Sequence, residues 1–259
     1  MHKTIEFSNS SGKILSGILR VPDIEYQDFD KIPLVMFLHG FNEQKNSQLL
    51  QSLSYNCSSR FATFVFDFAG HGESQGDFHL HTINEQLDDI FSAIKFCETI
   101  PEIDCENIAF VGHNIGGDLG AISCQDEYIN DRIKCFISLG SKFELDAYLK
   151  NFLSKTELSR LKGTGMHKGM FDINIEYLES VEKFDARKSL TELSIPSMLI
   201  YGLYDKYVKD FEARENFSLV KSKKELLFLE TDHQFSSQEI IQERNNIIFS
   251  FLSKHLVIN

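Results

Sequence analysis

The run Val-Gly-His-Asn-Ile-Gly-Gly, residues 111–117, has the spacing of a tight turn between a strand and a helix. Enzymes use a Gly-x-Ser-x-Gly turn at such a place to lift a nucleophilic serine above a sheet. The glycines fit, because the turn is sharp and neighbouring backbones pass close to it. Asn114 stands where the nucleophile would be. A glycine-rich turn without any catalytic role is the alternative interpretation.

Two more candidates follow apolar runs later in the chain. His233 would be a general base and acid, tuned near neutral pH, and Asp205 would orient it and stabilise its charged form. The alternative is that both are ordinary loop residues. Asp210 is the fallback acid, but it is expected inside the next helix, and Asp232 is expected to be a loop or cap residue. The order nucleophile position, acid, histidine is the one expected for this elbow.

Backbone groups complete the candidate site. The run Leu-His-Gly-Phe, residues 38–41, ends an earlier apolar run. The N–H groups of Phe41 and Ile115 would form an oxyanion hole, and because both are main-chain groups their side chains matter little. The run at residues 67–74 is interpreted as a glycine-rich turn, and we expect no direct chemistry from its His71 and Ser74.

The elements that must position these residues follow from the hydrophobic pattern. Continuous apolar runs are typical of parallel strands covered on both faces. Six strands are predicted in this way, at residues 33–38, 63–67, 107–111, 134–139, 197–201 and 225–229. An N-terminal hairpin is predicted at residues 3–8 and 13–20. Capping boxes at Thr82 with Glu85 and at Ser236 with Glu239 predict two helix starts.

Strands that alternate with helices predict an α/β fold, with a central, mostly parallel sheet flanked by helices. The absence of repeats and of Pro/Gly-rich linkers favours a single domain over residues 1–259. Residues 142–190 hold helical pieces and a glycine-rich middle without a core strand. An insertion of this length between two core strands predicts a lid or cap.

Composition excludes several classes of function. The net charge of −12 and the pI of about 5.2 make nucleic acid an unfavourable partner. We expect no metal and no cofactor, because the chain lacks metal-ligand spacing, a Walker A motif and a dinucleotide fingerprint. Five cysteines without a C-x-x-C pair favour reduced thiols in a cytoplasmic protein.

The N-terminal residues and the apolar runs bear on targeting and on membrane insertion. Residues 1–7 carry charge and no apolar region, so no signal peptide is expected. The longest apolar run, residues 34–38, is too short to cross a bilayer, so no membrane insertion is expected. The expected partner is a small molecule, and the sequence leaves room for a homodimer.

Several motifs together resemble the serine hydrolases of the α/β-hydrolase superfamily. They are His-Gly-Phe at 39–41, Asp-x-x-Gly-His-Gly-x-Ser at 67–74, Gly-His-x-x-Gly-Gly at 112–117, Gly-x-x-Asp at 202–205 and Asp-His at 232–233. The chain is most similar to the small bacterial feruloyl/cinnamoyl esterases and to the neighbouring serine aminopeptidase-like group. The run from Gly70 to Phe78 is the most telling piece. The resemblance covers nearly the whole chain and implies that residues 142–190 cover an acyl pocket for an ester or acid ligand.

Asn114 departs from this family pattern. An amide is a poor nucleophile and cannot form the acyl-enzyme ester, so the resemblance implies an ester hydrolase that is inactive or very slow. Three explanations compete: a natural pseudo-hydrolase that binds an ester-, acid- or hormone-like ligand, an engineered Ser→Asn substitution, and water activation by His233 and Asp205. Related hydrolases of haloalkanes or epoxides carry Asp at the elbow, for which Asn is isosteric, but the rest of the chain resembles them less. The presence of Asp205 and His233 argues against a long-standing loss of catalysis.

Overall fold

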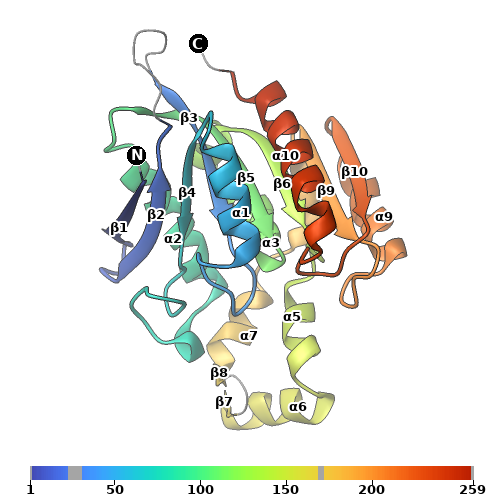
Figure 1. Cartoon of the computed structure of the whole chain (residues 1–259). Coiled ribbons are helices and arrows are strands. Elements are labelled where there is room, and N and C mark those ends of the chain that lie inside the picture. The colour runs from blue at the N-terminus through green and yellow to red at the C-terminus, as the bar shows by residue number, and fades with distance from the viewer. Residues whose placement is uncertain (1, 23–30, 169–171, 258–259) are drawn as a thin grey trace.

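A central sheet organises the molecule. The computed structural model describes residues 2–22, 31–168 and 172–257. Eight strands form this sheet in the order β1-β2-β4-β3-β5-β6-β9-β10 (Figure 1). Their bounds are β1 His2–Ser8, β2 Ile14–Arg20, β3 Ile32–Leu38, β4 Ala62–Phe66, β5 Ile103–His113, β6 Ile133–Leu139, β9 Ser197–Gly202 and β10 Lys224–Leu229.

The direction of the strands matches the prediction. β1 and β2 form the expected antiparallel hairpin, and β2 is also antiparallel to β4. All other neighbours in this sheet are parallel. Each of the six predicted core strands corresponds to an observed strand, with boundaries that differ at the ends. The predicted α/β fold with a mostly parallel sheet is confirmed.

Helices connect the strands and cover the sheet. The helices are α1 Gln48–Cys57, α2 Ile83–Cys97, α3 Ile115–Ser123, α4 Glu127–Asn130, α5 Leu145–Phe152, α6 Lys155–Thr164, α7 Ile175–Val181, α8 Ala186–Glu192, α9 Asp210–Leu219 and α10 Ile241–His255, with 3-10 turns η1 Phe78–Leu80 and η2 Gln238–Ile240. No helix in the described ranges is long and apolar enough to span a bilayer.

Strand β3 shows why its sequence is apolar without interruption. All of its residues are buried. Leu34 and Met36 belong to the core cluster that includes residues of α2 and α3, whereas Val35 and Phe37 belong to the cluster formed with α1 and α10. Figure 1 shows α1 and α10 together over one face of the sheet. Because successive side chains point to opposite faces, a strand covered on both sides must be apolar at every position.

The segment between β6 and β9 extends beyond the sheet. It contains α5, α6, α7, α8 and the small β7 (Met166–His167) and β8 (Ile173–Asn174) hairpin. Figure 1 shows α5, α6 and α7 beyond one end of the strands. The expected lid boundary at residue 190 falls inside α8, which packs against α3. Residues 169–171 of the expected lid lie outside the described residues.

One of the two predicted capping boxes is wrong and the other is half formed. The Thr82 hydroxyl accepts the Glu85 N–H at 3.2 Å, but the Glu85 carboxylate pairs with Lys13. The Ser236 backbone N–H and hydroxyl both donate to the Asp232 carboxylate, at 3.0 and 2.8 Å. In the described part of the chain the Ser236 hydroxyl accepts no helix N–H, and α10 begins only at residue 241 after the turn η2.

The cysteines are all buried and free, in agreement with the expected reduced thiols. Burial disfavours the charged thiolate and raises the pKa of Cys57 to about 12. The same cause raises the pKa of Cys124 and Cys135 to about 12. These thiols therefore pack as small apolar groups.

Candidate active site

The predicted turn after β5 places Asn114 at its tip. Asn114 has φ 55° and ψ −125°, and α3 starts at the next residue. A positive φ is strained for a residue with a Cβ and persists only where the surroundings hold it. The turn also requires glycine at position 116, where a Cβ would lie 2.3 Å from the Leu38 carbonyl oxygen. Close packing of the loop after β3 on this turn therefore explains the glycine that follows Asn114.

Asp205 and His233 reach the same place from neighbouring strands. Asp205 follows β9 and His233 follows β10, and both strands run parallel to β5, so their carboxyl ends share one edge of the sheet. His233 Nδ1 lies 2.7 Å from Asp205 Oδ2. On the other side of the ring, Asn114 Nδ2 lies 2.7 Å from His233 Nε2. The structure thus brings the three predicted side chains into one hydrogen-bonded row.

The surroundings of Asp205 keep it charged. Its second oxygen accepts the N–H groups of Tyr207 at 2.7 Å and Val208 at 3.0 Å. Burial raises the pKa of Asp205, but the hydrogen bond and charge of His233, with these backbone donors, outweigh burial and hold that pKa below its usual value. An ionised Asp205 accepts a hydrogen bond from the Nδ1–H group of His233. The Nε2 lone pair of His233 then faces the Asn114 amide, whose N–H group donates to it.

The expected oxyanion donors have different surroundings. The Phe41 N–H donates to Asn114 Oδ1 at 3.2 Å. His39 positions the loop that carries Phe41, since its ring contacts the Gly40 carbonyl at 2.9 Å and accepts the Phe68 N–H at 3.1 Å. For the Ile115 N–H, we find no hydrogen-bond acceptor in the described part of the chain. The carboxamide of Asn114 therefore bridges an oxyanion donor and the histidine.

The other sequence candidates have structural roles. Asp210 is the exposed first residue of α9 and pairs with Arg214 at 2.8 Å, so the fallback acid does not meet His233. The Ser74 hydroxyl donates to the Asp67 carbonyl at 2.6 Å. The His71 ring packs edge-on against Phe78 with 5.0 Å between centroids. The turn at residues 67–74 thus has the structural role that we expected.

A buried ion pair beside the site was missed by the sequence analysis. Glu43 Oε2 lies 2.9 Å from His113 Nδ1 and accepts the Gly40 N–H at 3.0 Å. Burial raises the pKa of Glu43, but the charge and hydrogen bond of His113 outweigh it and lower that pKa to about 2. Burial in turn lowers the pKa of His113, and Glu43 more than reverses this. His113 Nε2 lies 3.0 Å from the His233 carbonyl oxygen, so the pair supports the loop that carries His233.

A second buried charge ties two site loops together. Lys45 is 1% exposed, and its Nζ lies 2.6 Å from Asp67 Oδ2 and 2.6 Å from Glu73 Oε2. The Lys45 backbone N–H also donates to Asp67. Lys45 comes from the loop after β3, and the two carboxylates come from the turn after β4. This pairing fixes the loop of Phe41 against the glycine-rich turn.

The cavity at the site is small. Its volume is about 60 Å³, and it is lined by Phe41, Glu43, Asn114, Tyr148, Asn151, Phe152, Tyr207, His233 and Gln234. Small-molecule sites usually have about 300 Å³ or more, whereas a water molecule needs only about 30 Å³. The rings of Phe41 and Phe152 stack with 5.4 Å between centroids, so α5 helps to close the site. In this conformation the cavity has room for water but not for an aromatic ester.

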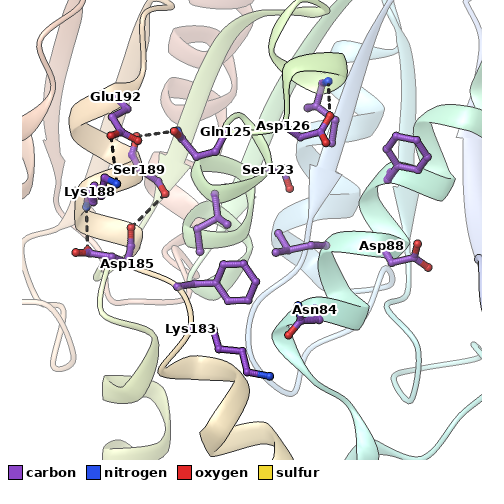
Figure 2. Close-up of a pocket in the computed structure, with 15 residues that line it drawn as sticks. Asn84, Asp88, Ser123, Gln125, Asp126, Lys183, Asp185, Lys188, Ser189 and Glu192 are labelled. Carbon is purple, nitrogen blue, oxygen red and sulfur yellow. Dashed lines mark hydrogen bonds and ion pairs between the residues drawn. The ribbon is translucent and has the colours of Figure 1, made fainter.

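A larger cavity lies elsewhere. It has about 740 Å³ and opens between α2, the end of α3, and α8. Figure 2 shows Asp126, Lys188 and Glu192 among its lining residues, with Lys188 paired with Glu192 of the same helix. None of Asn114, Asp205 and His233 lines it. We therefore take the hydrogen-bonded row of Asn114, His233 and Asp205, rather than the volume of a cavity, as the mark of the candidate site. Within the described residues, no cluster of metal-ligating side chains is found.

Sequence comparisons identify relatives for part of the chain. The family described as alpha/beta hydrolase fold matches residues 33–164. Two curated relatives, each an uncharacterized 31.7 kDa protein in the traX-finO intergenic region of Escherichia coli, are 29% identical over 135 residues. This match spans 52% of this chain and 46% of each relative, so it covers less than half of the relatives' length.

Solved structures with the same fold cover nearly the whole chain. Est1E from Butyrivibrio proteoclasticus with ferulic acid bound has a TM-score of 0.84 at 17% identity, covering 97% of this chain and 98% of its own. Alpha/beta hydrolase domain-containing protein 10 from mouse has a TM-score of 0.78 at 17% identity, and the match covers 97% of this chain and 99% of the mouse protein. The esterase PF2001 of Pyrococcus furiosus has a TM-score of 0.73 at 20% identity, and the match covers 99% of this chain and 92% of the esterase. At such identities the likeness establishes the fold.

Proposed function

The chain belongs to the α/β-hydrolase fold family, and from this premise we propose that it is a carboxylic-ester hydrolase scaffold whose nucleophile is replaced by Asn114. As given, the chain hydrolyses esters very slowly or not at all. One observation supports this most strongly: the Asn114 carboxamide bridges the Phe41 N–H and His233 Nε2, where a serine ester would react.

The roles follow from the positions of these groups. In an Asn114→Ser variant the hydroxyl would attack an ester carbonyl, and His233 would take its proton and pass it to the leaving alcohol. Asp205, bonded to the far ring nitrogen of His233, would hold the imidazole in the productive tautomer. The Phe41 and Ile115 N–H groups would hold the developing oxyanion.

Asn114 blocks this chemistry in two ways. Its amide nitrogen is a poor nucleophile, so no acyl-enzyme ester can form. Its carbonyl oxygen also accepts the Phe41 N–H, which a substrate carbonyl would need. A substrate can therefore reach the oxyanion donor only after the Asn114 side chain rotates away. Replacement by serine removes the amide and frees both Phe41 and His233.

The substrate must also open the site. Tyr148 and Phe152 of α5 line the cavity, whose volume of about 60 Å³ is smaller than any ester in the proposed class. We assign residues 142–190 as the lid, and α5 is the part that contacts the site. The structure of Est1E, which has the same fold, contains bound ferulic acid, and we propose a small aromatic or short-chain acyl group as the substrate class.

The test compares the given chain with Asn114→Ser on p-nitrophenyl acetate, p-nitrophenyl butyrate and methyl ferulate. We expect turnover in the variant and none above background in the given chain. Adding His233→Ala to the serine variant should abolish that turnover. Activity in the given chain that His233→Ala removes would contradict the proposal and favour direct activation of water. If both chains are inert but bind the esters saturably, the alternative of a non-catalytic binding protein replaces the proposal.

A further inference from the structure

The Asn114 side chain is held as an acyl substrate would be held. Its carbonyl oxygen accepts a hydrogen bond from the Phe41 N–H at 3.2 Å. In acyl-transfer sites, such a backbone N–H donates to the carbonyl oxygen of the substrate. The Asn114 amide nitrogen lies 2.7 Å from His233 Nε2, where the proton donor to a leaving group belongs. The Phe41 donor requires an oxygen there, so the amide nitrogen must face His233. The amide oxygen thus contacts the N–H group that would polarise an acyl carbonyl, and the amide nitrogen contacts the histidine that would protonate a leaving group.

We propose that Asn114 is a modification site, at which the chain hydrolyses its own side-chain amide and converts Asn114 to aspartate. The co-reactant is water and the second product is ammonia. The inference uses the same site as the proposed function, but it does not depend on ester hydrolysis by a serine variant. It also goes beyond that function, because the substrate is the chain itself.

The steps balance with groups that the site contains. A water molecule in the cavity first displaces the amide N–H from His233 Nε2. Its oxygen then forms a bond to Cγ of Asn114 while Nε2 takes one water proton, and the C=O π pair moves to Oδ1. The Phe41 N–H stabilises this oxyanion. His233 then gives its proton to Nδ2, the Cγ–Nδ2 bond breaks with its electron pair on nitrogen, and ammonia leaves. The C=O bond re-forms, and the new carboxylic acid loses its proton to ammonia, so a carboxamide and water become a carboxylate and ammonium.

The cavity provides the place for the water. It borders both Asn114 and His233, and its volume of about 60 Å³ exceeds the share of one water molecule, about 30 Å³. Asn114 is half-buried, so its amide is accessible from this side. Holding the amide permanently between its catalytic groups replaces a binding step, and such preorganisation is worth many orders of magnitude in effective concentration. The protein needs no ligand to start the reaction.

The partners of His233 suit the proton transfers. Asp205 is buried, and its carboxylate holds Nδ1–H of His233 at 2.7 Å, which leaves Nε2 unprotonated to accept a proton from water. After the reaction, a carboxylate at position 114 would lie against His233, and the imidazolium form of this ring would pair with it. The product places at the elbow a carboxylate, a group that forms covalent intermediates in other hydrolases.

The experiment follows the purified full chain in water enriched in heavy oxygen, with peptide mass spectrometry of the segment that contains Asn114. We expect this residue to gain the mass of an amide-to-acid change, with heavy oxygen in the side chain and normal aspartate as the only isomer. The exposed Asn246 of α10 reports the background rate within the same chain. A freshly purified chain that already carries aspartate only at position 114 also supports the proposal, provided the histidine variant retains asparagine.

The controls separate the proposal from spontaneous chemistry. His233→Gln should slow the conversion on the order of 100-fold, and Asp205→Asn, which keeps the side-chain shape, should slow it comparably. Circular dichroism checks that each variant folds, and either one alone suffices as a control. Conversion no faster than at Asn246, equal rates in the two variants and the parent, or a mixture with iso-aspartate would each overturn the proposal. Ester hydrolysis by Asn114→Ser is measured in a separate assay, so this inference can fail while the proposed function stands.

Discussion

Asn114 Nδ2 and His233 Nε2 lie 2.7 Å apart, with the amide as donor and the ring nitrogen as acceptor. The contact ties the tip of the turn after β5 to the loop after β10. The contact occupies the Nε2 lone pair in this conformation, so an incoming alcohol or water molecule must displace the amide N–H before His233 can take a proton. The predictions below test the groups around this contact.

The acid partner of His233 can be identified by a matched pair of substitutions. In the Asn114→Ser background, Asp205→Asn should lower kcat by about 1,000- to 10,000-fold, because the imidazole is then held in the wrong tautomer. Asp210→Asn should leave kcat unchanged, because Asp210 is exposed and pairs with Arg214. Steady-state hydrolysis of p-nitrophenyl acetate measures both. A similar loss in the two variants would contradict the assignment of Asp205.

The aromatic contact between α5 and the loop after β3 should control access. In the Asn114→Ser background, Phe152→Ala removes the ring that stacks on Phe41 and widens the site. We expect kcat/KM for methyl ferulate to rise about tenfold relative to p-nitrophenyl acetate. Phe211→Ala, at an exposed phenylalanine of α9, is the matched control and should not change this ratio. An unchanged ratio in both variants would remove Phe152 from the substrate path.

The Glu43–His113 pair should shape stability against pH. Glu43 has its pKa lowered from 4.5 to about 2, so its contribution is present above about pH 4.5 and is lost as pH falls towards 2. His113 has its pKa raised above 6.5, so its contribution is present below that value and is lost as pH rises through the raised pKa. Glu43→Gln should therefore lower the free energy of unfolding by about 3 kcal/mol near pH 5.5.

Urea denaturation between pH 2 and pH 8 measures this effect. The difference between Glu43→Gln and the parent should shrink as the pH falls from 4.5 towards 2, because Glu43 is protonated first in the unfolded chain and then, near pH 2, in the folded chain. Glu225→Gln is the control, because Glu225 forms an exposed pair with Lys254 that is worth at most about 1 kcal/mol. A pH-independent difference for Glu43→Gln would contradict the linkage.

Substitution of Lys45 should lower the free energy of unfolding more than substitution of an exposed charged residue. Lys45→Met leaves the buried carboxylate of Asp67 without its cation, and breaking a buried pair in this way costs about 3–5 kcal/mol. Lys188→Met removes a cation from an exposed pair with Glu192 and should cost at most about 1 kcal/mol. The free energy of unfolding from urea curves compares them. Equal losses would mean that the buried pair contributes no more than a surface one.

Much of the fold was predictable because burial leaves a local pattern. The run at residues 34–38 is apolar at every position, and β3 is buried on both faces. Asp205 and His233 each follow such a run, and parallel strands end at one edge of the sheet. Their convergence could therefore be predicted without coordinates. The turn around Asn114 was predictable in the same way, from its glycine spacing.

The capping box at Ser236 was wrong for the opposite reason. A serine followed three residues later by glutamate matches a helix start, but the Ser236 hydroxyl donates to the Asp232 carboxylate at 2.8 Å and α10 begins five residues later. The pairing of Glu43 with His113 joins residues 70 positions apart in the chain. A partner this distant along the chain leaves no mark on local periodicity.

The sequence alone was sufficient to place Asn114 at the tip of the turn, but the direction of its amide was decided by tertiary packing. Its oxygen meets Phe41, 73 positions away, and its nitrogen meets His233, 119 positions away. Hydrogen bonds depend on distance and angle within tenths of an ångström, and such positions arise only when strands, loops and helices pack together. Residue types therefore define which groups are available, and the packed chain decides which of them meet.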